Sequence, residues 1–179
     1  MNEDGEINSK DYVPIGYSPV PRINYGLTLG GRYKNFDASV FFQGVGQVSN
    51  YYSGVNTFET NVQGSYYDYH KTAWTAERYA SGAEITYPAL STGATSNHLR
   101  NSFFIMDKSY CRLRNVELGY TLNSEKIQKI GIKNVRFSLN GQNLLLFTKF
   151  KMKHIDPELN HPLDYPLSKT VSIGLSANF

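Results

Sequence analysis

The sequence predicts an all-β protein whose strands run antiparallel, and three observations support this prediction. Apolar and polar residues alternate with period two over stretches of about ten residues, as in strands with one apolar face. Aromatic residues make up 14% of the 179 residues, with 14 Tyr and 10 Phe against one Trp, and tyrosine suits a boundary between water and apolar surroundings. Glycine is plentiful, with 15 residues, whereas long helical patterns are scarce.

The clearest alternation covers Pro21–Gly44 and predicts a β-hairpin. One parity is apolar or aromatic from residue 23 to 33 and again from 36 to 42, while the other parity carries mostly glycine and polar residues. The dipeptide Lys34-Asn35 interrupts the alternation and predicts a two-residue turn. Because Lys is a poor residue for the positive φ of a type I′ turn, a slightly longer turn is the alternative.

A two-residue turn fixes which residues face each other across the hairpin. On the apolar face the predicted pairs are Tyr33 with Phe36, Gly31 with Ala38, Leu29 with Val40, and Leu27 with Phe42. On the opposite face the same register places Arg32 across from Asp37. An opposite-charge pair of this kind stabilises neighbouring strands.

Three further strands are predicted, at Cys111–Thr121, Asn134–Phe147 and Val171–Phe179, each with its apolar residues on one parity. The segment Ser124–Gly131, between the first two of these strands, has a Ser cap at its start and a Gly at its end. It therefore predicts a single short helical turn.

The alternating segments have the length and composition of strands that cross a bilayer. A tilted strand needs roughly 9–11 residues to cross, and no segment has the roughly 18 consecutive apolar residues of a membrane-spanning helix. The polar faces carry Gly, Ser, Thr, Asn and Gln, which fits the wet interior of a membrane barrel. The predicted fold is therefore an antiparallel transmembrane β-meander. Its lipid-facing residues should share one face of the sheet, and they are Leu27, Leu29, Val40, Phe42, Leu118, Phe137, Ile173 and Leu175.

Two places break the alternation. Arg112 and Arg114 share the parity of the apolar residues of their strand, and Asn143 does so in the next strand. A β-bulge near Asn115 and another near Gly141 would restore the pattern, because a bulge inserts one extra residue. The alternative is that these strands leave the bilayer before those residues.

Aromatic residues and connection lengths predict the orientation of the strands. Tyr33, Phe36, Tyr120 and Phe179 fall at one end of their strands, as in the aromatic girdle at a membrane interface. The connections alternate between short and long, in the order Lys34-Asn35, Val45–Arg100, Leu122–Lys133 and Thr148–Ser168. Membrane barrels place short turns in the periplasm and long loops outside, so residues 1–20 are expected outside and Phe179 in the periplasm.

Composition excludes several classes of function. The net charge is +3, and the basic residues are scattered, so a nucleic-acid partner is not indicated. Cys111 is the single cysteine, which excludes an internal disulfide framework. The four histidines show no metal-ligand spacing and no nucleophile set stands out, so the chain is not expected to be an enzyme. Residues 1–11 are acidic and polar, unlike an export signal, so the chain is expected to be either a fragment or a protein that is not exported.

Several stretches resemble the end of the SusC/RagA family of TonB-dependent outer-membrane proteins. These stretches are Pro21–Gly30, Tyr33–Gly44, Tyr110–Thr121, Asn140–Leu144, Phe147–Lys149, Asp156–Glu158 and Val171–Phe179. They follow the family's order over nearly the whole chain. The 45–100 segment matches only loosely, around Trp74-Thr75 and Tyr87-Pro88.

This resemblance implies a bacterial outer-membrane barrel of about 22 strands with a plugged lumen, of which 21–179 would supply the last five strands and 1–20 an extracellular loop. It implies import of glycan or peptide fragments, together with a SusD-like surface lipoprotein and the TonB energy-coupling complex, which acts through the plug. The sequence lacks the plug, so the fragment alone is not expected to transport. Phe179, an aromatic residue that closes the last strand, resembles the assembly signal of such barrels.

The first residues resemble an EF-hand calcium loop that lacks its first two positions. The ligands would be Asn2, Asp4, Glu6 through its carbonyl, Asn8 and Asp11, and Gly5 would supply the turn. The first ligand is missing, and Asp11 is shorter than the usual bidentate Glu. Calcium is therefore expected in the intact parent, and the alternative is an acidic loop that is simply solvated.

Aromatic residues gather in the 45–100 segment and form a second candidate site. Tyr66, Tyr67, Tyr69 and Trp74, next to His70, are the types that stack on sugar rings or contact a lid. The alternative is that they pack on one another. Two proline-containing motifs, Asp156-Pro157-Glu158 and His161-Pro162, are interpreted as rigid loop elements.

Two other functions compete with a membrane barrel. A soluble β-sandwich carbohydrate-binding module would also be rich in Tyr and loops, but its apolar face would form a core between two sheets. An autonomous small barrel would need oligomerisation, because five strands are fewer than the eight of the smallest membrane barrels.

Overall fold

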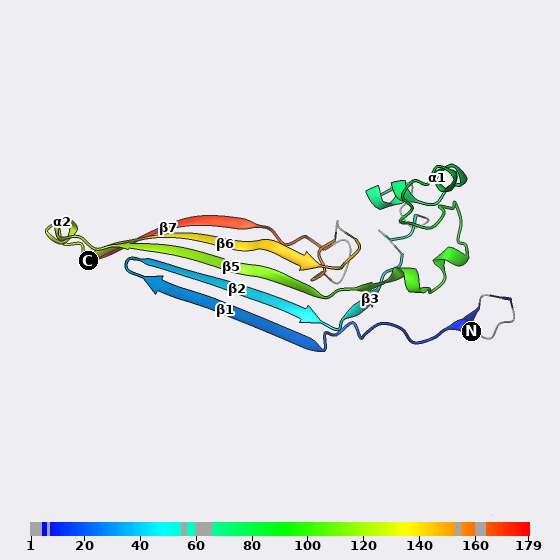
Figure 1. Cartoon of the computed structure of the whole chain (residues 1–179), viewed down its shortest axis with the longest axis horizontal. Helices are drawn as coiled ribbons and strands as arrows, with labels where there is room; N and C mark the ends of the chain where they lie inside the picture. The colour runs from blue at the N-terminus through cyan, green and yellow to red at the C-terminus, as the bar shows by residue number, and fades with distance from the viewer. Residues whose placement is uncertain (1–4, 7, 55–56, 60–65, 153–154, 160–163) are drawn as a thin grey trace.

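The computed structural model describes residues 5–6, 8–54, 57–59, 66–152, 155–159 and 164–179 of the chain. Its main element is a long antiparallel sheet of five strands with the order β1-β2-β5-β6-β7 (Figure 1). These strands are β1 (Ile23–Tyr33), β2 (Phe36–Gly46), β5 (Tyr110–Leu122), β6 (Asn134–Thr148) and β7 (Thr170–Asn178). The predicted all-β antiparallel meander is confirmed, and β1 and β7 are the two edges of the sheet.

The hairpin has the register that the alternation predicts. Leu29 lies opposite Val40 and Tyr33 opposite Phe36, on either side of a two-residue turn. Lys34 has a φ of 54° and is the only one of the two turn residues with a positive φ. The turn is therefore not type I′, which needs positive φ at both central residues. The two-residue turn is confirmed, and the longer alternative is wrong.

The two irregularities that break the alternation are bulges, as predicted. The pairing of β2 with β5 and of β5 with β6 skips Arg114, and on β6 it also skips Asn143 and Leu144. Asn143 has a φ of 54°. Because a bulge shifts the parity of the residues beyond it, Arg112 pairs with Gln43 and belongs to the polar face of the sheet.

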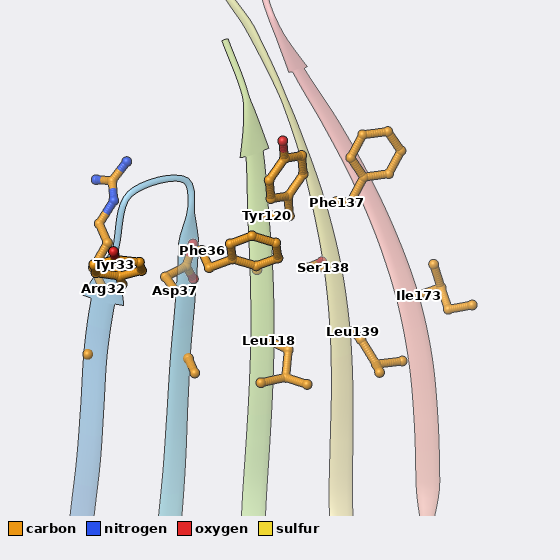
Figure 2. Close-up of a pocket in the computed structure, with 13 residues that line it drawn as sticks. Arg32, Tyr33, Phe36, Asp37, Leu118, Tyr120, Phe137, Ser138, Leu139 and Ile173 are labelled. Carbon is orange, nitrogen blue, oxygen red and sulfur yellow. The ribbon is translucent and has the colours of Figure 1, made fainter.

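One face of the sheet is apolar and open. All eight residues predicted to face lipid fall on it, because pairing and steps of two positions connect them: Val40 pairs with Val116, two positions from Leu118, and Leu118 pairs with Leu139, which is opposite Ile173 and two positions from Phe137. Figure 2 shows Phe36, Leu118, Leu139 and Ile173 side by side on four neighbouring strands. Ile173 is 86% exposed. Within the described residues no second sheet covers this face, so it is not the core of a sandwich.

The long connection between β2 and β5 is structured, which alternation alone does not predict. Residues 47–109, here called the loop domain, contain a two-stranded sheet of β3 (Ser49–Tyr51) and β4 (Ile105–Asp107). They also contain η3 (Asp68–Thr72), α1 (Ala76–Ala80), η4 (Ser96–His98) and η5 (Ser102–Phe104). Phe58, Ala73, Tyr87 and Phe104 form a buried, mostly aromatic core in this domain. The loop domain lies beyond one end of the main sheet (Figure 1).

The opposite end of the sheet holds the short connections. The predicted helical turn is α2 (Glu125–Gln128), where the Ser124 side chain accepts a hydrogen bond from the Lys126 amide. Gly131 has a φ of 87° and follows the turn, as expected of a helix stop. None of the helices in the described ranges has the length and apolar character needed to cross a membrane.

Candidate functional site

The polar face of the sheet, here called the inner face, carries an ion network near the short turns. The Arg136 guanidinium contacts the carboxylates of Asp37 at 2.5 Å and Glu117 at 2.7 Å. Arg136 reaches across β5 because Gly119 has no side chain, and a Cβ there would clash with both Arg136 and Asp37. Arg32 is opposite Asp37 in the register, as predicted, but the ion pair of Asp37 recorded in the structure is with Arg136 two strands away.

A second ion network lies at the other end of the inner face, near the loop domain. Arg112 contacts both carboxylate oxygens of Asp156 at 2.6 Å and Glu158 at 2.5 Å. Glu158 also accepts from Arg114 at 2.7 Å, so one carboxylate bridges two guanidinium groups. The interpretation of Asp156-Pro157-Glu158 as a rigid loop element was incomplete, because both acids pair with arginines of β5. His161-Pro162 lies outside the described residues.

Lys108 adds a third cation next to this network. Its ammonium group donates to the Leu159 carbonyl at 2.8 Å, and the side chain is buried. Burial lowers the pKa of Lys108, and the nearby Asp156 carboxylate partly opposes this shift. Three cations and two carboxylates thus join residues 155–159 to the base of the loop domain and to β5.

The predicted aromatic site divides into a packed part and an open part. The rings of Tyr67 and Tyr69 stack at 5.6 Å, and Tyr69 lies 4.3 Å from the buried ring of His70. Burial raises the pKa of Tyr69, so its hydroxyl stays protonated. Tyr66 and Trp74 remain 60% and 45% exposed. Packing therefore accounts for Tyr67 and Tyr69, and of these four residues Tyr66 and Trp74 keep exposed rings, although the Tyr66 ring also lies 5.7 Å from His70.

A buried carboxylate, absent from the sequence prediction, organises the loop domain. Glu59 is 5% exposed and accepts hydrogen bonds from the Ser91 amide at 3.0 Å and the Tyr87 hydroxyl at 3.2 Å. His98 Nε2 lies 3.1 Å from the same carboxylate. Because His98 Nδ1 accepts from the Thr95 amide, a neutral ring carries its proton on Nε2 and donates it to Glu59.

These contacts set the protonation of Glu59. Burial raises the pKa of the carboxyl, but the backbone hydrogen bonds and His98 outweigh burial and lower the pKa below its ordinary value. Burial likewise raises the pKa of Tyr87, and the Glu59 charge adds to the shift. Glu59 is thus a carboxylate surrounded by donors. Its partners are 28 to 39 residues away in sequence, and no local spacing marks them.

The candidate calcium loop is described only in part. Asn2 and Asp4 lie outside the described residues, and Gly5 has the positive φ, 81°, expected of a sharp turn. Asn8 caps η1 (Ser9–Asp11) by accepting from the Lys10 amide at 2.9 Å, while the Asp11 carboxylate accepts from the Asn8 amide at 3.1 Å. No group of three or more His, Cys, Asp or Glu side chains in the described ranges is arranged to hold a metal ion.

An aromatic band crosses the apolar face near the short turns. Figure 2 shows Tyr33, Phe36, Tyr120 and Phe137 around an open hollow on this face. The rings of Phe36 and Tyr120 are 4.7 Å apart. Phe179 follows β7 at the same end and is 78% exposed. The predicted gathering of aromatic residues at one end is confirmed.

Proteins named TonB-dependent receptors are similar to this chain in sequence. No family model matches the chain. "TonB-dependent receptor P26" and "TonB-dependent receptor P3", both of Formosa agariphila, are 29% identical over 196 residues and 31% identical over 182 residues. The alignments cover 99% and 98% of this chain. The chain spans 19% and 16% of the length of these relatives.

Solved structures show the same fold. The RagAB peptide importer in its 'open-open' state matches with a TM-score of 0.71 and 23% identity, over 97% of this chain and 19% of that one. The importer in its 'closed-closed' state matches with a TM-score of 0.66 and 22% identity, over 96% of this chain and 20% of that one. The structural likeness gives the fold, and the two receptor sequences, aligned over nearly every residue, give the family. This chain belongs to the TonB-dependent receptors.

Proposed function

We propose that this chain forms part of the wall of a bacterial outer-membrane barrel that imports glycan or peptide fragments. The open apolar face that runs over all five strands carries the proposal, since lipid covers such a face without a second protein layer. The residues would supply the last five strands of about 22, with the loop domain outside the cell. The apolar face would contact outer-membrane lipid, and the inner face would line the lumen.

The remaining partners of the receptor are part of the same proposal. Uptake would need the TonB energy-coupling complex, acting through a plug that these residues do not supply, so these 179 residues alone would not transport. A SusD-like lipoprotein would cover the outer end. The likeness to the RagAB peptide importer supports a substrate made of short polymers, with peptide and oligosaccharide as the two candidate classes.

A matched pair of charged substitutions tests the lipid-facing assignment. Ile173→Arg on the apolar face should cost about 2 kcal/mol or more, because charge on the lipid side of a barrel is destabilising. Ser172→Arg, the adjacent residue on the inner face, should cost much less. We would measure the heat-modifiable folded band of the full-length receptor in outer membranes and its urea unfolding. Equal losses for the two variants would contradict the membrane wall.

We further propose that Tyr66 and Trp74 contact the substrate or the lipoprotein. Both rings are exposed on the loop domain, and an exposed aromatic face stacks on a sugar ring or packs against a partner. Trp74→Ala should weaken ligand or lipoprotein binding several-fold in the full-length receptor, as measured by pull-down and titration. Exposed Tyr79 provides the control, since Tyr79→Ala removes an even more open ring, 71% exposed against 45% for Trp74, outside the proposed site. An identical loss for both variants would argue against a specific contact.

Calcium at residues 2–11 remains a proposal for the intact receptor. Carboxylate and carbonyl oxygens at these spacings suit a hard cation. Calorimetric titration of the full-length receptor with calcium should show binding that Asp4→Ala weakens by tenfold or more, roughly the effect of removing one carboxylate ligand. Lys10→Gln, which removes a nearby charge but no ligand, is the control. Equal heats for wild type and Asp4→Ala would dispose of the site.

A further inference from the structure

The hollow on the apolar face lies where two neighbouring strands carry small residues. Gly31 of β1 is paired with Ala38 of β2, and Leu118 of β5 continues this row. The row nearer the short turns is aromatic, with Tyr33 opposite Phe36. The change from large rings to Gly31 and Ala38 leaves a depression beside the aromatic band, and Figure 2 shows the rings at its border.

The space next to Gly31 is empty, unlike the space next to the other described glycines of this face. A Cβ at Gly31 would meet no atom within 4 Å. The others each have a neighbouring side chain within that distance, namely Tyr25 at Gly44, Ile23 at Gly46 and Leu144 at Gly141. The sheet therefore fills its other gaps with its own side chains and leaves the hollow at Gly31 to an outside group.

The hollow continues along a row of aliphatic side chains. Leu118, Leu139 and Ile173 lie side by side on β5, β6 and β7 (Figure 2). All three are exposed. The hollow has a volume of about 810 Å³, which is in the size range of ligand sites. An elongated, open and apolar shape of this kind suits a hydrocarbon chain.

A lysine ammonium group lies at the border of the hollow. Lys34 Nζ is 5.3 Å from the centre of the Tyr33 ring, within the range of a cation–π contact. None of the ion pairs within the described ranges uses Lys34. The nearby carboxylate of Asp37 is paired with Arg136 on the inner face. The border of the hollow thus offers a positive charge beside an apolar surface.

The charge of the short connections has the same sign. Residues 34–35 and 122–133 together contain four lysines and one glutamate. Lys126 in α2 and Lys129 directly after it are exposed. Because α2 and the β1–β2 turn lie at the same end of the sheet (Figure 1), this end has an excess of positive charge next to the apolar face. Basic residues in such a position attract anionic lipid head groups.

We propose that the hollow binds one phospholipid with an anionic head group, taken from the leaflet that faces the periplasm. One acyl chain would lie over Gly31 and Ala38, and the phosphate would contact the Lys34 ammonium group. This inference rests on the proposed function, which places the apolar face in lipid and the short turns in the periplasm. A phospholipid of this class combines the hydrocarbon chain and the negative charge that the two parts of the site require. The competing occupant is a side chain of the barrel strand that precedes β1.

Photo-crosslinking of the full-length receptor tests the site. The probe is phosphatidylglycerol with a diazirine in one acyl chain, added to nanodiscs of phosphatidylethanolamine. It should label residues 29–40 about fivefold more than a phosphatidylethanolamine probe with the same chain, because one lysine attracts an anionic lipid by about that factor. Lys34→Gln should abolish this preference. Lys149→Gln removes an exposed charge at the other end of the sheet and should retain it.

Filling the hollow provides a second, independent variant. Gly31→Leu should lower the labelling of residues 29–40 by the phosphatidylglycerol probe about threefold or more, because the new side chain replaces the acyl chain and its dispersion contacts. Gly30→Leu adds the same side chain to the inner face, where a Cβ has contacts no shorter than 3.4 Å, and should label as wild type. Loss of the heat-modifiable folded band in Gly31→Leu alone would indicate that a side chain of the preceding strand occupies the hollow, which would overturn the proposal.

Failure of the site and failure of the proposed function give different labelling patterns. Equal labelling of residues 29–40 by the two probes would overturn the site, as would labelling that neither Lys34→Gln nor Gly31→Leu changes, while the peptide around Ile173 would still be labelled by lipid. If the apolar face did not contact lipid, the Ile173 peptide would also stay unlabelled, and both proposals would fall. Labelling requires no uptake, so a positive result would support the site in a receptor whose substrate is still unknown.

Discussion

Replacing Glu59 by alanine is expected to unfold the loop domain while the five-stranded sheet stays intact. The carboxylate is buried and accepts from Ser91, Tyr87 and His98. Its removal leaves these donors without their acceptor in a site closed to water. Leaving a buried donor without its acceptor costs about 1–3 kcal/mol for each donor, and the loss for all three is a large fraction of what a small domain can lose.

Hydrogen exchange of the full-length receptor in detergent measures this effect by segment. Peptides that cover Tyr87 and His98 should lose about two orders of magnitude of protection, because 1.4 kcal/mol corresponds to about a factor of ten. Peptides from β6 should not change. Lys71→Gln, which breaks the exposed pair of Lys71 with Asp68, is the control and should have almost no effect. Similar losses for both variants would show that Glu59 does not organise the domain.

Acid should weaken the same domain. The pKa of Glu59 is lower in the folded protein than its ordinary value. Its contribution to stability is therefore fully present above the ordinary carboxyl pKa and is lost as the pH falls through the lower, folded value. The protection of the loop domain at neutral pH should accordingly decline in acid, and the Glu59→Ala variant should show less of this decline.

The sheet could be predicted from the sequence because its determinants are local. Alternation with period two assigns each residue to a face, and a two-residue turn fixes the register of Leu29 with Val40. The same reasoning located both bulges, since charged or polar residues on an apolar parity have few explanations. It also predicted which residues face each other within a single pair of strands. It could not predict that the Arg136 side chain passes over Gly119 of β5 and reaches the strand beyond it, β2.

The loop domain could not be predicted because its contacts are not periodic. Glu59 and His98 are 39 residues apart, and nothing between them has the spacing of a helix or a strand that would bring them together. The composition of Tyr66, Tyr67 and Tyr69 fits both packing and ligand contact equally, and only burial separates them. In the same way, Asp156 and Glu158 become ion-pair partners of Arg112 and Arg114 only in the folded chain, 44 residues away in sequence.

Replacing Phe179 by alanine is expected to lower the amount of assembled barrel several-fold without changing synthesis of the receptor. The residue closes β7, an edge strand that pairs with β6 on one side. In lipid, the other side must pair as well, because unpaired backbone N–H and C=O groups are costly there. We propose that Phe179 marks this strand for assembly.

The structure around Phe179 indicates how its position is fixed. Lys133 donates from its amide to the Asn178 carbonyl at 2.7 Å and from its ammonium group to the Phe179 carbonyl at 2.9 Å. These bonds hold the strand end beside the connection between β5 and β6 and leave the aromatic ring outside the sheet. The backbone contacts do not need the ring, so Phe179→Ala should keep them and remove only the exposed aromatic surface.

Tyr33→Ala is the matched control for this prediction. Tyr33 is an exposed aromatic residue at the same end of the same face, but it lies in a hairpin rather than at the closing end of β7. If assembly depended only on exposed aromatic surface at the membrane interface, the amount of assembled barrel would fall to the same extent in both variants. If Phe179 directs assembly, its variant alone should accumulate unfolded, with normal total protein on an immunoblot and a weak heat-modifiable band. Full assembly of the Phe179→Ala variant would contradict this role of Phe179. Barrel closure would then depend on the edge pairing of β7 and not on the side chain that follows the strand.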